Sequence, residues 1–593
     1  MARKTENLVP LPEYPRPLLA RDEWVNLNGR WRFDYDTDGS GEDAGWHETG
    51  DLKRSIMVPY VHQAPLSGIG DPAQVDYVWY AREFAVLSSW LRDRLVLNFG
   101  AVDYEATVWV NGQKVGEHRG GFTPFSCDIT AACRPGEGNL LVVRAFDPIT
   151  PEHPSGKQSE RESYGCMYTR STGIWQTVWL EPLGEAFVGV PRIITSLKDA
   201  HVKLRVPVTG SAENVYVRVN VQSGGSMLAT PEVQPRDGYA EFDIRIPDPV
   251  PWNMETAHLY DMRIVTRRGQ VITDRASSYF GMRDVEVSGD RVLLNGEPLV
   301  FRGILDQGLW PDGIYTAPSD LEMRNEISRS LQFGFNSARL HQKVFDPRQL
   351  YWADRMGYPV WAEFPDWGCD LANPAARENL MREWLEAVSR DISHPSIIIW
   401  TPLNERTGES YHSDPVQHDF VRELVRRTKE LDSTRPVCST SGYEHVTETD
   451  IADTHDYRHD PEALRKTYTP PFGESGPVTG HNHPTFTQGE RYSGQPVIVS
   501  EMGGMWWDPE KAADTEAWGY GDRPKSVEDF IRIYKDIIQV CLECPALSGF
   551  VYTQLTDVEQ EVNGLYTYDR KPKFDHDAIA AITRMPVEPK PGG

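Results

Sequence analysis

The most constraining feature of this sequence is a regular alternation of apolar runs and helical patterns in its second half. Amphipathic stretches separate most of the runs, and one of them begins with the capping box Ser319-x-x-Glu322. A count of about eight β/α units in about 300 residues predicts a (β/α)8 TIM barrel over 287–593, with a doubly wound open sheet as the alternative. The apolar runs lie at 299–304, 335–340, 358–363, 396–401, 435–440, 451–455, 496–500 and 547–552.

The first half of the chain predicts two β-sandwich domains. Apolar residues alternate along 94–99, and Asn111-Gly112 suits a hairpin turn between two strands. We therefore predict a jelly-roll β-sandwich over 1–183 and an immunoglobulin-like β-sandwich over 184–286. Residues 147–173 break the pattern with Pro, Ser, Gly and charged residues, which indicates either a disordered segment or a functional loop.

Composition narrows the class of protein. The formal net charge is −26, which disfavours nucleic acid or an anionic membrane as a partner. No apolar run approaches the ~20 residues of a membrane span, and the N-terminus has no signal-like apolar core, so a cytoplasmic location is the expectation. Seven cysteines form no disulfide pattern, and Cys541-x-x-Cys544 is interpreted as structural rather than as a zinc or redox pair.

Two carboxylates stand at the ends of predicted barrel strands. Glu405, preceded by Asn404, follows the fourth run, and Glu501 follows the seventh. Active sites of such barrels lie at the C-terminal strand ends, where these two residues would face each other. A glutamate after a strand is often only a surface residue, but two in facing positions favour glycoside hydrolysis. One carboxylate would then be a protonated acid with a raised pKa and the other an ionised nucleophile.

Several motifs together resemble glycoside hydrolase family 2, which contains β-galactosidases and β-glucuronidases. They are Asn404-Glu405 and Glu501, the opening 26–33 (NLNGRWRF), 121–129 (GFTPFSCDI) and 170–176 (RSTGIWQ). The resemblance covers nearly the whole chain and agrees with the predicted order of domains, in which the first domain would be sugar-binding-like.

The family resemblance implies a role for each strand-end residue. Glu405 would be the acid/base and Glu501 the nucleophile, and Asn404 would hydrogen-bond the sugar 2-hydroxyl. His341 after the second run would contact substrate, and Tyr457 after the sixth would hydrogen-bond the nucleophile. This chemistry needs neither a cofactor nor a metal, so none is expected. The resemblance also implies assembly as a homo-oligomer through the sandwich domains, which no stretch of the sequence demonstrates.

Aromatic side chains at strand ends are candidates for stacking on the sugar. They are Trp367 after the third run, Trp506 after the seventh and Tyr552 at the end of the eighth. A single tryptophan is more often a core residue than a sugar platform, so only position supports these three.

The substrate motifs depart from the known branches of the family. The lysine of the glucuronidase motif Asn-x-Lys is missing from Glu561-Val562-Asn563-Gly564, which disfavours a glucuronide. Galactosidase motifs after the first and second runs are replaced by 305–310 (LDQGLW) and 340–343 (LHQK). The prediction is a retaining, exo-acting, galactosidase-like glycoside hydrolase. A β-D-galactofuranosidase or α-L-arabinofuranosidase, with Asp306 and Trp310 shaping the pocket, is the alternative.

Rival functions and the access to the site complete the predictions. A non-catalytic carbohydrate-binding protein would not need both glutamates, and a metal-dependent hydrolase would need a His-x-His motif after the first run. An interaction protein would work through its sandwich domains alone.

Loops 147–173 and 467–495 are expected to roof the site, which implies exo action on an oligosaccharide or glycoside. A metal at His481 and His483 is not expected, since no third ligand is evident.

Overall fold

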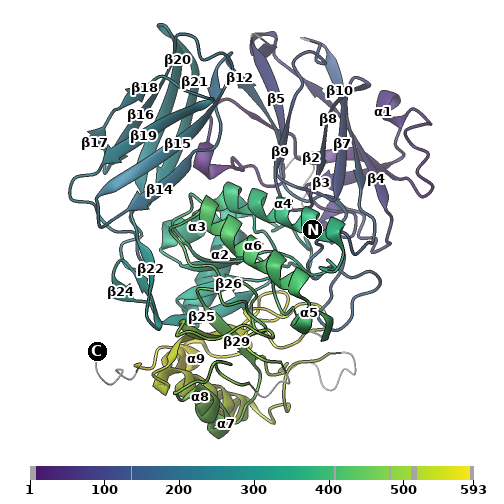
Figure 1. Cartoon of the computed structure of the whole chain (residues 1–593). Helices are drawn as coiled ribbons and strands as arrows, with labels where there is room; N and C mark the ends of the chain where they lie inside the picture. Colours follow the sequence, from purple (N-terminus) through teal and green to yellow (C-terminus); the bar gives the residue numbers. More distant parts are fainter. Residues whose placement is uncertain are drawn as a thin grey trace.

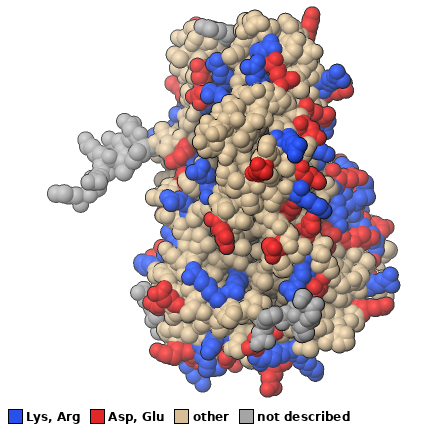
Figure 2. Space-filling model, turned by 90° about the vertical axis from the view of Figure 1, so that its left-hand side faces the viewer, with Lys and Arg blue, Asp and Glu red and all other residues tan. Residues whose placement is uncertain are grey.

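The computed structural model describes residues 9–91, 93–134, 136–406, 409–479, 483–508 and 517–587. Two β-sandwiches lie side by side above a third domain of parallel strands and helices (Figure 1). None of the described helices is long and apolar enough to cross a membrane. Figure 2 shows basic and acidic side chains interspersed over the face that it draws, without an extended patch of one sign.

The first sandwich packs a four-stranded sheet, in the order β1-β12-β5-β9, against a six-stranded sheet, in the order β3-β2-β4-β10-β7-β8. Alternate apolar residues of both sheets, such as Leu95, Leu97 and Phe99 of β5, are fully buried between them. The predicted hairpin forms at Asn111-Gly112. The strands are β1 (Val25–Asn26), β2 (Gly29–Tyr35), β3 (Arg54–Val58), β4 (Tyr77–Ala85), β5 (Arg94–Phe99), β7 (Glu105–Val110), β8 (Gln113–Arg119), β9 (Phe125–Asp128), β10 (Gly138–Phe146) and β12 (Val178–Leu183), and the short pair β6 (Val102–Asp103) and β11 (Gly173–Ile174) lies beside them.

The second sandwich shows the predicted alternation directly. In β15, Val202, Leu204 and Val206 are buried while the intervening Lys203 and Arg205 are exposed. The strands are β13 (Phe187–Val188), β14 (Arg192–Ser196), β15 (His201–Thr209), β16 (Val215–Ser223), β17 (Ser226–Ala229), β18 (Glu232–Val233), β19 (Tyr239–Arg245), β20 (Tyr260–Arg268) and β21 (Val271–Phe280). A small sheet of β22 (Val285–Ser288), β23 (Arg291–Leu294) and β24 (Glu297–Pro298) follows. The predicted division at 183 falls at the end of β12, before the second sandwich, whereas the division at 286 falls within β22. We retain both divisions as a proposal.

The third domain contains seven parallel strands in the order β28-β27-β26-β25-β31-β30-β29. The predicted fifth run forms no regular strand among the described residues, but Val437 and Ser441 make single parallel bridges to Trp400 and Asn404 beside β28. This segment therefore takes the fifth position of the barrel. The strands are β25 (Phe301–Asp306), β26 (Ser337–Leu340), β27 (Val360–Glu363), β28 (Ile397–Thr401), β29 (Ala452–Asp456), β30 (Val497–Gly503) and β31 (Leu547–Thr553).

Helices begin at the caps that the sequence indicates. Ser319 accepts a hydrogen bond from the Glu322 amide at the start of α2, and Asp414 caps α6 just before Pro415. The helices are α1 (Trp46–Thr49), α2 (Asp320–Gln332), α3 (Pro347–Met356), α4 (Pro374–Asp391), α5 (Glu409–Ser413), α6 (Pro415–Leu431), α7 (Pro461–Tyr468), α8 (Val527–Glu543) and α9 (His576–Thr583). Helix α1 lies in the first domain, and the helices of the third domain share a hydrophobic core with the barrel strands.

Both sandwiches are hydrogen-bonded to the barrel. Trp252 of the second sandwich donates to the Asp354 carbonyl at 2.8 Å, and the Tyr104 hydroxyl of the first donates to Glu383 of α4 at 2.7 Å. Segment 147–173 of the first domain reaches the C-terminal ends of the barrel strands, where the Gly156 amide donates to the Pro365 and Trp367 carbonyls. Of the two predictions for this segment, the structure therefore agrees with an ordered loop.

Candidate active site

The two carboxylates selected from the sequence lie together at the barrel mouth. One oxygen of Glu405, one of Glu501 and a ring nitrogen of His455 all lie within 4.8 Å of one another. Glu405 has a positive φ of 49°, in the left-handed region that non-glycine residues seldom adopt, and its amide donates to the Ser441 carbonyl at 2.9 Å. Backbone strain of this kind is common at functional sites, where the surrounding structure holds it in place.

Arg339 of β26 orients the residues around Glu501. Its guanidinium is fully buried and donates to Glu501 Oε1 at 2.6 Å and to Glu363 Oε2. It also donates to Asn404 Oδ1 at 2.6 Å, which fixes which end of that amide is the oxygen. The Asn404 Nδ2 group is buried and has no hydrogen-bond partner among the described residues. A donor is therefore held unused beside the two carboxylates, ready for a hydroxyl of a bound sugar.

Glu501 has the environment of an ionised nucleophile. The Tyr457 hydroxyl donates to its second oxygen, as the family resemblance implies, and the Tyr457 ring stacks on Tyr520. Burial raises the pKa of Glu501, but His455 and Arg339 lower it by more, so its pKa lies below the ordinary value. The carboxylate therefore stays charged at neutral pH.

Glu405 differs from the sequence-based expectation of a raised pKa. Its side chain is 25% exposed, and its Oε1 lies 2.6 Å from His455 Nδ1. Burial raises the pKa of Glu405, but His455 and the more distant Lys157 and Arg339 lower it by more. His455 shows the reverse: burial lowers its pKa, and Glu501 and Glu405 raise it above 6.5. These opposite shifts favour the proton on the imidazole over the carboxylate of Glu405. The strand-end pattern did not single out His455.

His341 and Trp367 also lie at the site. His341 Nδ1 is 2.8 Å from Glu363 Oε1 and 3.9 Å from Glu501 Oε1. The Trp367 indole donates to the Asn404 carbonyl at 3.1 Å, and its ring is partly exposed at the mouth. Trp367 therefore remains the candidate for a sugar platform.

The other two aromatic candidates lie away from the carboxylates or are covered. Tyr552 is fully buried and packs edge-on against Tyr534 of α8, outside the ring of strands. Trp506 is also buried, with the Arg523 guanidinium 3.2 Å from its ring centroid. Neither ring offers a free face to a sugar, so we do not retain them as platforms.

Asp306 and Trp310 form part of a buried network beside α2 rather than the sugar pocket. Asp306 accepts from the Gly308 amide at 2.8 Å, and burial, with Glu326 nearby, raises its pKa to about 7. The Trp310 ring is covered by Arg570 at 4.0 Å and packs against Met323 of α2. The structural premise of the furanosidase prediction, that these two residues shape the pocket, is therefore not met.

Two groups of side chains within the described residues have the composition of metal ligands. Glu405, His455 and Glu501 form one, and buried Cys438, His445 and Asp453 form the other. In the second group the Cys438 thiol donates to Asp453 at 3.0 Å, and burial holds the pKa of that thiol well above its ordinary value. A retained thiol proton suits a hydrogen-bond network better than a metal site. Of the histidine pair considered from the sequence, His481 lies outside the described residues, and His483 lies 3.8 Å from Glu444.

Segment 147–173 brings two side chains that the strand-end search missed. Tyr168 is buried, donates to Glu561 after β31, and accepts from Gln307 after β25 at 2.7 Å. The ammonium of Lys157 lies 5.3 Å from the Trp367 ring centroid and 5.9 Å from that of Tyr168. The only sequence signal for them was the length of the aperiodic segment that carries them.

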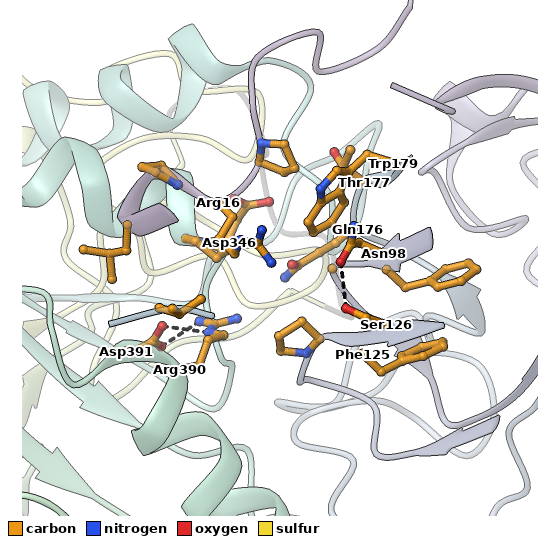
Figure 3. Close-up of a pocket in the computed structure, with 18 of the residues that line it drawn as sticks. Arg16, Asn98, Phe125, Ser126, Gln176, Thr177, Trp179, Asp346, Arg390 and Asp391 are labelled. Carbon is orange, nitrogen blue, oxygen red and sulfur yellow. Dashed lines mark hydrogen bonds and ion pairs between the residues drawn. The ribbon is translucent and has the colours of Figure 1, made fainter. Parts of the chain in front are cut away.

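A separate pocket lies between the first sandwich and the ends of α3 and α4 (Figure 3). Its charged pair, Arg390 and Asp391, is joined at 2.7 Å, and Ser126 donates to Asn98 at 2.7 Å. Its lining residues include neither Glu405 nor Glu501. The chemistry therefore belongs to the barrel mouth.

A TIM barrel with two facing carboxylates after its fourth and seventh strands, below two β-sandwiches, defines an O-glycosidase. Three family models match in order: "Glycosyl hydrolases family 2, sugar binding domain" over 24–153, "Glycosyl hydrolases family 2" over 186–283 and its "TIM barrel domain" over 285–505. The chain belongs to glycosyl hydrolases family 2, as its motifs indicated.

Similar proteins include glucuronidases and galactosidases. A β-glucuronidase of Paenibacillus borealis is 27% identical over 464 residues, covering 72% of this chain and 74% of that protein. A β-galactosidase of Thermoanaerobacter pseudethanolicus is 26% identical, covering 60% of this chain and 48% of that protein. The structure of a Ruminococcus gnavus β-glucuronidase with D-glucuronic acid superposes with a TM-score of 0.78 at 18% identity, covering 97% of this chain and 100% of that one. This last likeness concerns the fold alone.

Proposed function

We propose that this chain is a retaining, exo-acting β-glycosidase that removes a terminal sugar by double displacement. The observation that carries the proposal is the approach of one Glu405 oxygen and one Glu501 oxygen to within 4.8 Å. Retaining enzymes hold their two carboxyl groups about 5–5.5 Å apart, whereas inverting enzymes leave about 6.5–9.5 Å for a water molecule. The short separation supports direct attack by a carboxylate on the anomeric carbon.

In the proposed first step, Glu501 attacks the anomeric carbon while Glu405 protonates the departing oxygen. The proton comes from His455 Nδ1, which lies 2.6 Å from Glu405 Oε1. When Glu501 bonds to the sugar, it loses its negative charge. Only Glu405 is then left to stabilise the imidazolium of His455, so the pKa of His455 falls and proton transfer to Glu405 becomes easier. In the second step Glu405 removes a proton from a water molecule whose oxygen attacks the anomeric carbon. The bond from that carbon to Glu501 breaks, and the sugar is released with its original configuration.

Exo action is supported by the loop that crosses the mouth. Tyr168 joins the first domain to Glu561 beyond the last barrel strand, and the amides of Ser155 and Gly156 join it to the third. An enzyme that cuts within a polymer needs a cleft that is open at both ends. A loop in this place would close one end of such a cleft, so that only a terminal sugar could enter. The galactosidase-like assignment remains one of two hexoside options, since the relatives described above are glucuronidases and galactosidases.

A panel of p-nitrophenyl glycosides, hexopyranosides and furanosides alike, tests the proposal. Wild type should hydrolyse at least one β-hexopyranoside, and Glu501→Ala should abolish that turnover. Azide should restore turnover in Glu405→Ala on a substrate with a good leaving group, because azide attacks the glycosyl-enzyme in place of water and needs no general base. Glu286→Ala, an exposed glutamate of β22, is the matched control and should keep wild-type rates. Unimpaired turnover by Glu501→Ala would exclude the proposed mechanism.

A further inference from the structure

We propose that Lys157, which the first domain supplies to the barrel pocket, binds an anionic group on the far edge of the glycone, so that uronides are the preferred substrates. This inference rests on the proposed glycosidase function and names the substrate class of the same site. The lysine of the glucuronidase motif is missing from the loop after β31, where Glu561-Val562-Asn563-Gly564 stands. Lys157 would supply the corresponding charge from a different domain.

The backbone around Lys157 is fixed on both sides. The Ser155 amide donates to the Trp367 carbonyl at 2.9 Å, and the Tyr168 amide donates to the Lys157 carbonyl at 2.8 Å. Gly156 has a φ of 64°, and a Cβ there would lie 2.7 Å from the Gln342 carbonyl oxygen. The loop therefore packs on the barrel as closely as a glycine allows, and these bonds fix the backbone on both sides of Lys157. Such preorganisation lowers the entropy cost of binding a ligand group.

The ammonium group of Lys157 has no carboxylate ion-pair partner among the described residues. It lies 5.3 Å from the centroid of the Trp367 ring and 5.9 Å from that of Tyr168. Glu561 is engaged elsewhere, because its two oxygens accept hydrogen bonds from Tyr168 and Asn563. Burial lowers the pKa of Lys157, but the Cys166 thiol and the acidic residues Glu561, Glu501 and Glu405 raise it by more, so the group stays charged.

The position of Lys157 on the mouth matches the far edge of a bound sugar. An anomeric carbon between Glu405 and Glu501, with its 2-hydroxyl on Asn404, lies toward strands β28 and β30. The opposite edge of the ring, with C5 and its substituent, then points toward β25 and β31. Lys157 lies between Tyr168, which contacts residues after both of these strands, and Trp367, which follows β27. A carboxylate at C6 is the common anionic substituent of that edge, and an ammonium recognises it as a point charge.

Paired substrates that differ only at C6 test the inference. We would measure kcat/KM for p-nitrophenyl β-D-glucuronide against the β-D-glucoside, and for the β-D-galacturonide against the β-D-galactoside. Wild type should prefer one uronide over its neutral partner. Lys157→Met should lose at least about 100-fold on that uronide and less than about 3-fold on the neutral sugar, because only the uronide carries a charge that loses its partner. Lys157→Arg should keep the uronide preference.

The control is Arg161→Gln, an exposed cation of the same loop, which lies over the Tyr164 ring and should leave both rates unchanged. Equal losses on both members of a pair, or a wild type that hydrolyses only the neutral sugars, would overturn the assignment of Lys157 and leave the glycosidase proposal standing. Absence of turnover on every glycoside would instead refute the proposed function, and this inference with it.

Discussion

The orientation of Asn404 leads to a prediction about a single hydroxyl of the substrate. Its side-chain Oδ1 accepts a hydrogen bond from Arg339 at 2.6 Å. Its backbone amide donates to Asp366 at 3.0 Å, and its backbone carbonyl accepts from Trp367. The Nδ2 group is left as a buried donor without a partner among the described residues. We expect it to bind the 2-hydroxyl of the sugar and to bind it most strongly in the transition state.

The magnitude follows from the burial of this donor. Removing one preorganised donor from a water-excluded site costs about 3 kcal/mol of transition-state stabilisation. Because each tenfold change in rate corresponds to about 1.4 kcal/mol, Asn404→Ala should lower kcat/KM roughly 150-fold. The same variant should be unaffected, within about 3-fold, on a 2-deoxy glycoside, because that substrate has no hydroxyl to lose.

The assay measures kcat/KM of wild type and of Asn404→Ala, each on the normal and on the 2-deoxy glycoside. An effect of the substitution that does not involve the 2-hydroxyl is the same for both substrates. The difference between the two losses therefore reports the interaction between the amide and the hydroxyl. Asn325→Ala, on helix α2, serves as the control for loss of an asparagine. Equal losses on the normal and the 2-deoxy glycoside would refute the reasoning, because they would mean that Asn404 acts only by holding Arg339.

Three further predictions concern the residues around the carboxylates. His455→Gln should reduce the loss of thermal stability that wild type shows above pH 6.5. The pKa of His455 is raised in the folded protein despite burial. Its stabilising contribution is therefore present below pH 6.5 and is lost as the pH rises through the raised pKa. Tyr457→Phe should lower kcat about 10- to 100-fold and move the acidic limb of kcat/KM to higher pH, because Glu501 loses a donor that favours its charged form. Arg339→Met should lower the free energy of unfolding in urea by about 3–5 kcal/mol, since it strands two buried carboxylates; a loss below about 1 kcal/mol would contradict that ion-pair account.

The barrel and its carboxylate pair were predictable because both depend on periodicity. Seven of the apolar runs form strands, and strand order alone places Glu405 and Glu501 at one mouth. The fifth run was less regular than expected, because its segment pairs with the neighbouring strand β28 and the residues after it only through isolated bridges. Position along a strand was therefore a sound guide to which end of the barrel a residue occupies.

Direction of a side chain was less predictable than its position. Tyr552 stands at a strand end but faces α8, because successive residues of a strand point to opposite sides. His455 and Arg339 lie within strands, and only the tertiary structure shows that they contact Glu405 and Glu501. Lys157 comes from another domain in an aperiodic loop, and no local pattern connects such a loop to the barrel.

The central claim is that Glu501 forms a covalent bond to the sugar. The most direct measurement is mass spectrometry of peptides after incubation with an activated 2-deoxy-2-fluoro glycoside of the sugar identified by the panel. The account predicts one added glycosyl mass, located on Glu501, and its disappearance in Glu501→Ala. A label on Glu405, or no label together with release of the product in the opposite anomeric configuration, would contradict it.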